Sequence, residues 1–95
     1  MMIVKRGQDS EYDEYVVRIA DTVDVRFGKY YLDCSQSGDQ NYYINVNDDQ
    51  DSYFDFDRYK PFKNQIEVVN YITDKIKKRA LDILMDIEAH EKGQS

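Results

Sequence analysis

The spacing of apolar residues in this chain changes once, close to Pro61, and this change constrains the fold more than any other feature. Up to about residue 57, apolar and polar residues alternate, as in β-strands that bury one face. Beyond Pro61, apolar residues recur every three or four positions, as in an amphipathic helix. The apolar positions of this second pattern are Phe62, Ile66, Val69, Ile72, Ile76, Ala80, Ile83 and Ile87. We therefore predict an α+β fold.

The alternating half predicts an antiparallel β-meander of about five strands. Residues 22–27 show the pattern most clearly, with Val25 and Phe27 on one face. Gly28 and Lys29 are suited to a two-residue turn between strands. The predicted strands are residues 15–20, 22–27, 30–34, 42–46 and 52–57, residues 2–5 could add another, and residues 35–41 and 47–51 are predicted turns.

The C-terminal pattern predicts a helix that is long for so small a protein. A helix over residues 62–89 would measure about 42 Å, whereas a compact domain of this size is about 33 Å across. The helix could break near Thr73 and Asp74, or its distal part could pack against a second copy of the chain. We favour a homodimer. Its predicted contacts are Ile76, Ala80, Ile83, Leu84 and Ile87, with Leu81 and Met85 beside them.

Length and composition indicate one domain with one core, spanning residues 1–95. Within it, residues 1–58 form the predicted acidic β-sheet part, and residues 59–95 form the amphipathic helical part. The chain has no apolar run of the length that spans a bilayer or forms a signal peptide. A single cysteine, Cys34, cannot form an internal disulfide and fits a reducing compartment. We expect a cytoplasmic protein that does not bind membranes.

Charge is distributed as unevenly as periodicity. Residues 1–58 contain thirteen acidic and six basic residues, whereas residues 59–95 contain six acidic and seven basic ones. No basic residue lies between Lys29 and Arg58. The acidic residues concerned are Asp33, Asp39, Asp48, Asp49, Asp51, Asp55 and Asp57, and a second group, Glu11, Asp13 and Glu14, precedes the first long strand. A surface that only keeps a protein in solution would intersperse both signs.

Carboxylates at regular intervals on a rigid sheet can occupy the Lys and Arg side chains that another protein directs toward phosphates, because DNA affinity is largely electrostatic. On a strand, Asp55 and Asp57 would project from one face about 6.6 to 6.8 Å apart. Tyrosines between the acidic residues would add rigid contact area. Those predicted to face a partner are Tyr31, Tyr43 and Tyr53. This pattern predicts phosphate mimicry.

Catalytic and cofactor-binding motifs do not emerge from the sequence. Residues 47–58 partly match a calcium loop, but Ser52 stands where glycine is needed and Arg58 where a bidentate glutamate is needed. Neither Cys34 nor His90 has a partner at the spacing of a zinc site or a nucleophilic pair. We expect no enzyme activity, no metal and no cofactor. Direct DNA binding is also disfavoured, because the isoelectric point is about 4.6.

Residues 41–57, NYYINVNDDQDSYFDFD, precede an amphipathic helix in a short acidic chain. In this character the chain resembles the small DNA-mimic proteins that phages use against host defence, and in length and acidity it is most similar to the anti-restriction proteins of T-even phages. The resemblance implies a dimeric, DNA-shaped anionic surface that occupies a restriction endonuclease or a nucleoid protein of the bacterial host. It rests on general character, so it assigns no site residues.

Three functions therefore remain, of which the third is a calcium-modulated module built on residues 47–58. The first is a DNA-mimic inhibitor that binds the nucleic-acid site of a host defence or nucleoid protein. The second is a non-catalytic adaptor or assembly module that pairs through the apolar stripe of the C-terminal helix, with acidity serving solubility. Substitution of Asp55 and Asp57 by Asn separates the first two, because the inhibitor needs those charges and the adaptor does not.

Overall fold

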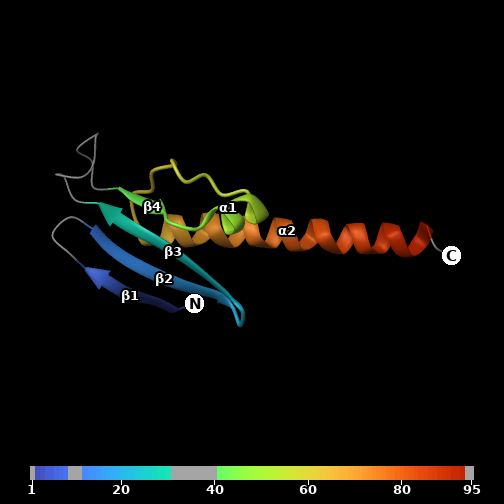
Figure 1. Cartoon of the computed structure of the whole chain (residues 1–95), viewed down its shortest axis with the longest axis horizontal. Coiled ribbons are helices and arrows are strands. Elements are labelled where there is room, and N and C mark those ends of the chain that lie inside the picture. Colours follow the sequence, from blue (N-terminus) through green and yellow to red (C-terminus); the bar gives the residue numbers. More distant parts are fainter. Residues whose placement is uncertain (1, 9–11, 31–40, 94–95) are drawn as a thin grey trace.

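The computed structural model describes residues 2–8, 12–30 and 41–93, which form a four-stranded antiparallel sheet, a short helix and one long helix. The strands lie in the order β1-β2-β3-β4, so neighbours in sequence are neighbours in the sheet (Figure 1). The α+β class is confirmed, with four described strands instead of about five. The elements are β1 (Met2–Gln8), β2 (Tyr12–Ala20), β3 (Val23–Tyr30), β4 (Tyr42–Ile44), α1 (Asp48–Phe54) and α2 (Gln65–Gly93).

The predicted turn at Gly28 and Lys29 is wrong, because both residues lie inside β3. The strand predicted over residues 22–27 continues through both residues to Tyr30, and β2 and β3 are joined at Asp21 and Thr22. Gly28 serves packing: a Cβ at this position would collide with the ring of Tyr12 on the neighbouring strand. The predicted strand over residues 30–34 and the turn over residues 35–41 fall largely outside the described residues.

The predicted turn at residues 47–51 and strand at residues 52–57 are also wrong, since this region folds into α1 and a tight turn. Asn47 caps the helix by accepting a hydrogen bond from the Gln50 amide at 2.8 Å. Asp48 and Asp49 occupy the first turn, where negative charge complements the helix dipole. Asp55 then ends the helix in the left-handed conformation, with φ 58°. The caps at Asn47 and Asp55 favour a helix here more strongly than the short alternation of residues 52–57 favours a strand.

Helix α2 is continuous through Thr73 and Asp74, which rules out the alternative of a break there. The helix begins at Gln65, after Asn64 accepts a hydrogen bond from the Glu67 amide at 2.9 Å. Phe62 lies before the helix and forms an isolated bridge with Tyr42. At 29 residues, α2 extends well beyond the sheet (Figure 1), and the longest extent of the molecule is 60 Å.

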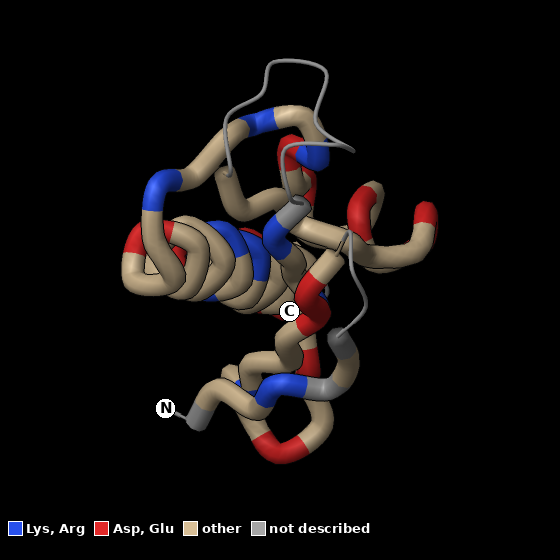
Figure 2. Tube along the Cα trace, turned by 90° about the vertical axis from the view of Figure 1, so that its left-hand side faces the viewer, with Lys and Arg blue, Asp and Glu red and all other residues tan. Residues whose placement is uncertain are grey.

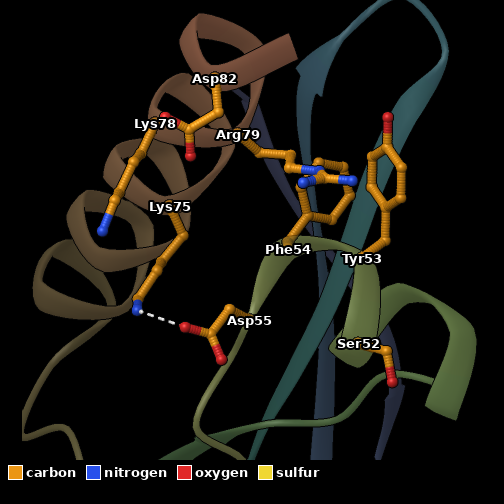
Figure 3. A pocket seen from close by; sticks show the side chains of 8 residues that line it. All are labelled: Ser52, Tyr53, Phe54, Asp55, Lys75, Lys78, Arg79 and Asp82. Atoms are coloured by element: carbon orange, nitrogen blue, oxygen red, sulfur yellow. Dashed lines mark ion pairs between the residues drawn. The ribbon is translucent and has the colours of Figure 1, made fainter. Parts of the chain in front are cut away.

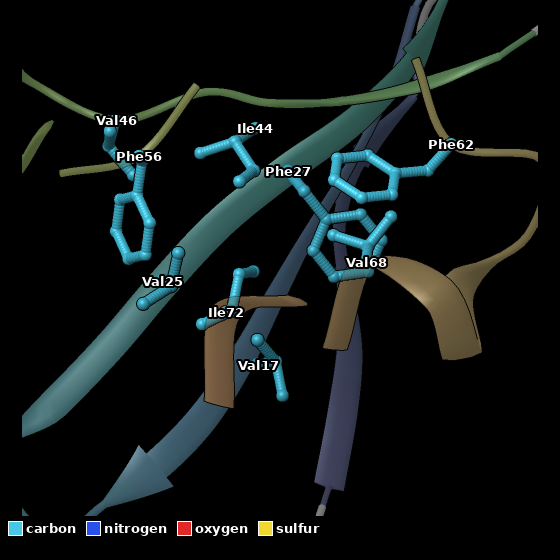
Figure 4. Packing of buried hydrophobic residues seen from close by; sticks show 9 residues of the cluster. All are labelled: Val17, Val25, Phe27, Ile44, Val46, Phe56, Phe62, Val68 and Ile72. Atoms are coloured by element: carbon cyan, nitrogen blue, oxygen red, sulfur yellow. The ribbon is translucent and has the colours of Figure 1, made fainter. Parts of the chain in front are cut away.

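The hydrophobic core lies between the sheet and the first half of α2 (Figure 4). Val68 and Ile72 are the residues of α2 that it buries. Tyr15 stacks on Phe27 at the edge of this cluster, with ring centroids 5.4 Å apart. The buried members are Val17, Val25, Phe27, Ile44, Val46, Phe56, Phe62, Val68 and Ile72. Since no described residue after Ile72 is buried, the second half of α2 stands outside the core.

Candidate interaction surfaces

Five of the acidic residues singled out in the sequence are brought together by α1 and the turn that follows it. We call this set the α1 acidic cluster; it consists of Asp48, Asp49, Asp51, Asp55 and Asp57. The expected strand row of Asp55 and Asp57 is wrong, because Asp55 is the left-handed residue at the end of α1 and Asp57 lies in the segment after it. The Asp57 carboxylate accepts a hydrogen bond from the Tyr59 amide at 3.0 Å. The five residues follow a short helix and the turn after it, not an extended strand.

Basic residues from outside the acidic run partly neutralise the α1 acidic cluster. Arg58 approaches two carboxylates at once, Asp48 at 3.1 Å and Asp51 at 3.2 Å. Lys75 of α2 lies 3.5 Å from Asp55. The sequence reading missed both pairings: Arg58 directly follows the acidic run and folds back on it, whereas nothing in the sequence signals the approach of Lys75. The expectation of carboxylates without local neutralisation is therefore wrong for these three.

The neutralisation is incomplete, because two cations face five carboxylates. Two of the three paired carboxylates remain in water: Asp48 is 88% exposed and Asp55 is 95% exposed, whereas Asp51 is 22% exposed. Ion pairs this exposed contribute little to stability, typically about 0 to 1 kcal/mol, and exchange readily with another cation. The α1 acidic cluster thus keeps an excess of negative charge that a cationic partner can reach.

The second acidic group lies in the sheet and is paired there. Asp13 is buried and lies 3.6 Å from Lys5, while Glu14 lies 3.7 Å from Arg26. Figure 2 shows the acidic positions spread over several segments of the chain, not lined along one edge of the sheet. Glu11, Asp33, Asp39 and Tyr31 lie outside the described residues. The structure therefore does not place the predicted carboxylates on a single face.

The tyrosines predicted to contact a partner occupy different surroundings. Tyr43 is half-buried in β4, whereas Tyr53 is about half exposed on α1, and the guanidinium of Arg79 lies 4.7 Å from the Tyr53 ring centroid. Tyr15 was not among them: burial raises the pKa of its hydroxyl from the usual value of 10.0, and nearby Tyr42 and Asp13 raise this pKa further.

A shallow notch of about 180 Å³ separates α1 from α2 (Figure 3). Arg79 reaches across it to Tyr53, and Lys75 reaches Asp55. Its remaining lining is Ser52, Phe54, Lys78 and Asp82. Three basic and two acidic side chains line the notch. Contacts between them hold the two helices together, and the mixed charges present no uniform surface to a ligand.

The second half of α2 carries an apolar surface that the rest of the described chain covers only at its start, at Ile76. We call it the distal α2 band; it consists of the five predicted dimer contacts, Ile76, Ala80, Ile83, Leu84 and Ile87. Ile76 packs against the edge of the core, whereas Leu84 and Ile87 expose half of their surface or more. Leu81 and Met85 are exposed to a similar degree beside the band. Large apolar side chains in such a continuous row favour contact with another protein surface.

Within residues 2–8, 12–30 and 41–93, no three His, Cys, Asp or Glu side chains gather as metal ligands would. In the same segments, no helix combines the length and apolar character needed to cross a membrane. Comparison of the chain with protein-family models, with curated proteins and with solved structures finds no match.

Proposed function

We propose that this protein is a non-catalytic inhibitor of the DNA-mimic, anti-restriction type, which occupies the nucleic-acid-binding site of a host defence or nucleoid protein in the bacterial cytoplasm. The observation that carries the proposal is the α1 acidic cluster, where five carboxylates outnumber the two cations that approach them. A cationic groove that binds phosphates attracts such a cluster, and the net charge of -6 adds to the attraction at a distance.

The exposure of the cluster supports this role. A partner's arginine or lysine can replace Arg58 at Asp48, or Lys75 at Asp55, at little cost, because these two carboxylates are exposed and exposed ion pairs are weak. Tyr53 lies on the same short helix and offers an aromatic surface about half of which is exposed. Negative charge and exposed aromatic surface are therefore both available to a partner on α1.

The test is capture from a bacterial lysate on the immobilised protein, followed by elution with salt or with a duplex DNA oligonucleotide. Mimicry predicts that a captured protein is released by duplex DNA and that its retention falls steeply between low and moderate ionic strength. Asp49→Asn with Asp57→Asn should weaken this retention. The matched control is Asp21→Asn with Asp74→Asn, which removes the same charge from exposed positions elsewhere. Retention that neither DNA nor the cluster variant reduces would contradict the proposal.

The distal α2 band favours a second candidate, an assembly module that binds an amphipathic helix of another chain through this band. The supporting observation is the exposure of Leu84 and Ile87 on a helix that projects beyond its own core. In this case Leu84→Gln should abolish association, whereas the Asp49 and Asp57 substitutions should leave it unchanged. Ile66→Gln is the control, because Ile66 is exposed near the start of the same helix.

A further inference from the structure

The charged residues beside the distal α2 band are ordered along the helix. At about 100° per residue, Lys77 and Glu88 fall on one side of the band, and Arg79 and Asp86 fall on the other. On both sides the basic residue is nearer the sheet and the acidic residue is nearer the C-terminal end. The two sides therefore carry the same sequence of charge, positive and then negative.

We propose that two copies of this chain pair antiparallel through the distal α2 band, about a two-fold axis close to Ile83. The inference names the partner for the assembly candidate above and rests on that candidate, but it does not depend on the role of the α1 acidic cluster. A two-fold axis requires the band to be complementary to itself. The apolar residues Ala80, Ile83, Leu84 and Ile87 lie within about a turn of this axis, so they would form the centre of the contact.

An antiparallel pair places each side of the band against the same side of its partner. With the axis close to Ile83, Lys77 faces the partner's Glu88. Arg79, whose guanidinium lies 4.7 Å from the Tyr53 ring of its own chain, would turn from that ring to face the partner's Asp86. The two-fold symmetry repeats both contacts, so four pairs of opposite charges face each other between the two copies. Charges that flank an apolar seam are known to set the direction in which two helices pair.

A parallel pair would place opposite sides of the band together at the same height. Lys77 would then face the partner's Arg79, and Asp86 would face the partner's Glu88. Like charges would meet at all four positions, which opposes association. The same residues that favour the antiparallel pair thus disfavour the parallel one.

The antiparallel direction determines the form of the dimer. The axis lies about 16 Å from the C-terminal end of α2 at 1.5 Å per residue, so two molecules of 60 Å would form a rod about 90 Å long. The two sheets, each with its α1 acidic cluster, would lie at opposite ends. A parallel dimer would be about 60 Å long, close to the length of one molecule.

Sedimentation and small-angle scattering of the wild-type chain over a range of concentrations measure mass and maximum dimension together. We expect dimeric mass with a maximum dimension of about 90 Å. Dimeric mass with a dimension close to 60 Å would overturn the antiparallel direction but keep assembly between copies. Monomeric mass at every concentration would overturn the pairing of two copies.

Charge reversal tests the register. Lys77→Glu should raise the dimer dissociation constant roughly ten-fold, since each new carboxylate would meet the partner's Glu88. The double variant Lys77→Glu with Glu88→Lys should restore the wild-type value. Lys78→Glu is the matched control: it makes the same charge change on the adjacent residue, which points away from the band, and should leave the constant unchanged. A tighter dimer for Lys77→Glu would indicate parallel pairing and overturn the proposal.

Disulfide cross-linking in a Cys34→Ser background gives an independent measure of direction. Ile83→Cys lies near the proposed axis and should cross-link in either direction, so it reports contact between the bands. Glu91→Cys should not cross-link in the antiparallel pair, because the two residues would be about 26 Å apart at 1.5 Å per residue. Efficient cross-linking at Glu91→Cys, or none at Ile83→Cys, would contradict the antiparallel pair.

Discussion

The ring of Tyr12 lies directly over Gly28 of the adjacent strand, in space that any side chain at position 28 would occupy. The Tyr12 hydroxyl accepts a hydrogen bond from the side-chain amide of Asn45 at 3.0 Å, so the Tyr12 side chain links β2 to the segment after β4. Glycine in mid-strand usually weakens a sheet, but here it permits the Tyr12 ring to pass over β3 and reach the segment after β4.

Gly28→Ala should therefore destabilise the fold by about 1 to 3 kcal/mol, because the methyl group would displace the Tyr12 ring. Urea denaturation measures the change in the free energy of unfolding. Gly7→Ala is the control, since a Cβ at Gly7 would meet no atom within 4 Å. In the background of Tyr12→Ala the cost of Gly28→Ala should largely disappear. An equal cost in both backgrounds would contradict this explanation.

Asn47→Ala should lower the free energy of unfolding by about 1 kcal/mol, because the Gln50 amide would lose the oxygen that caps α1. Asn47→Asp retains a capping oxygen and should remain close to wild type. Chemical denaturation of the three proteins gives the comparison. If the alanine and aspartate variants were equally destabilised, the cap would not be the cause.

The raised pKa of the Tyr15 hydroxyl predicts a stability loss at high pH. Below pH about 10 the hydroxyl is protonated in both the folded and the unfolded chain. As the pH rises beyond this value, the unfolded chain releases its proton first, so the free energy of unfolding decreases until the folded-state pKa is passed. Urea denaturation from about pH 8 to pH 11 should show a shallower decline for Tyr15→Phe than for wild type. Parallel curves would contradict the predicted pKa shift.

The two halves of α2 should respond differently to truncation of an apolar side chain. Ile72→Ala should cost about 2 to 5 kcal/mol, because Ile72 is fully buried in the core. Leu84→Ala should change the stability of the monomer by no more than about 0.5 kcal/mol, because Leu84 is half exposed. Thermal unfolding at low protein concentration checks both values. A large loss for Leu84→Ala under these conditions would place it inside the monomer core.

Periodicity was sufficient to predict the fold class and the long helix. The helical pattern spans more than twenty residues, and a pattern of that length is difficult to confuse with a strand. The alternation in residues 52–57 was too short to carry the same weight. There the polar capping residue Asn47 and the left-handed Asp55 decide the local structure, and Phe56 reaches the core from the segment after α1.

The charge surface was less predictable than the fold. The absence of basic residues between Lys29 and Arg58 correctly marks an acidic segment in the sequence. Neutralisation, however, depends on distance in space, and Lys75 approaches Asp55 from twenty positions along the chain. Only the tertiary packing of α2 beside α1 brings these two side chains together.

The left-handed backbone at position 55 limits which residues can stand there. Aspartate, asparagine and glycine adopt this conformation at low cost, whereas other side chains are strained. The backbone conformation alone therefore accounts for aspartate at this position, independently of any role for its negative charge. Asp55→Asn would remove the charge and keep a residue that tolerates the left-handed conformation. Asp55→Ala would remove the charge and also strain the backbone, so its effect could not be assigned to the charge alone.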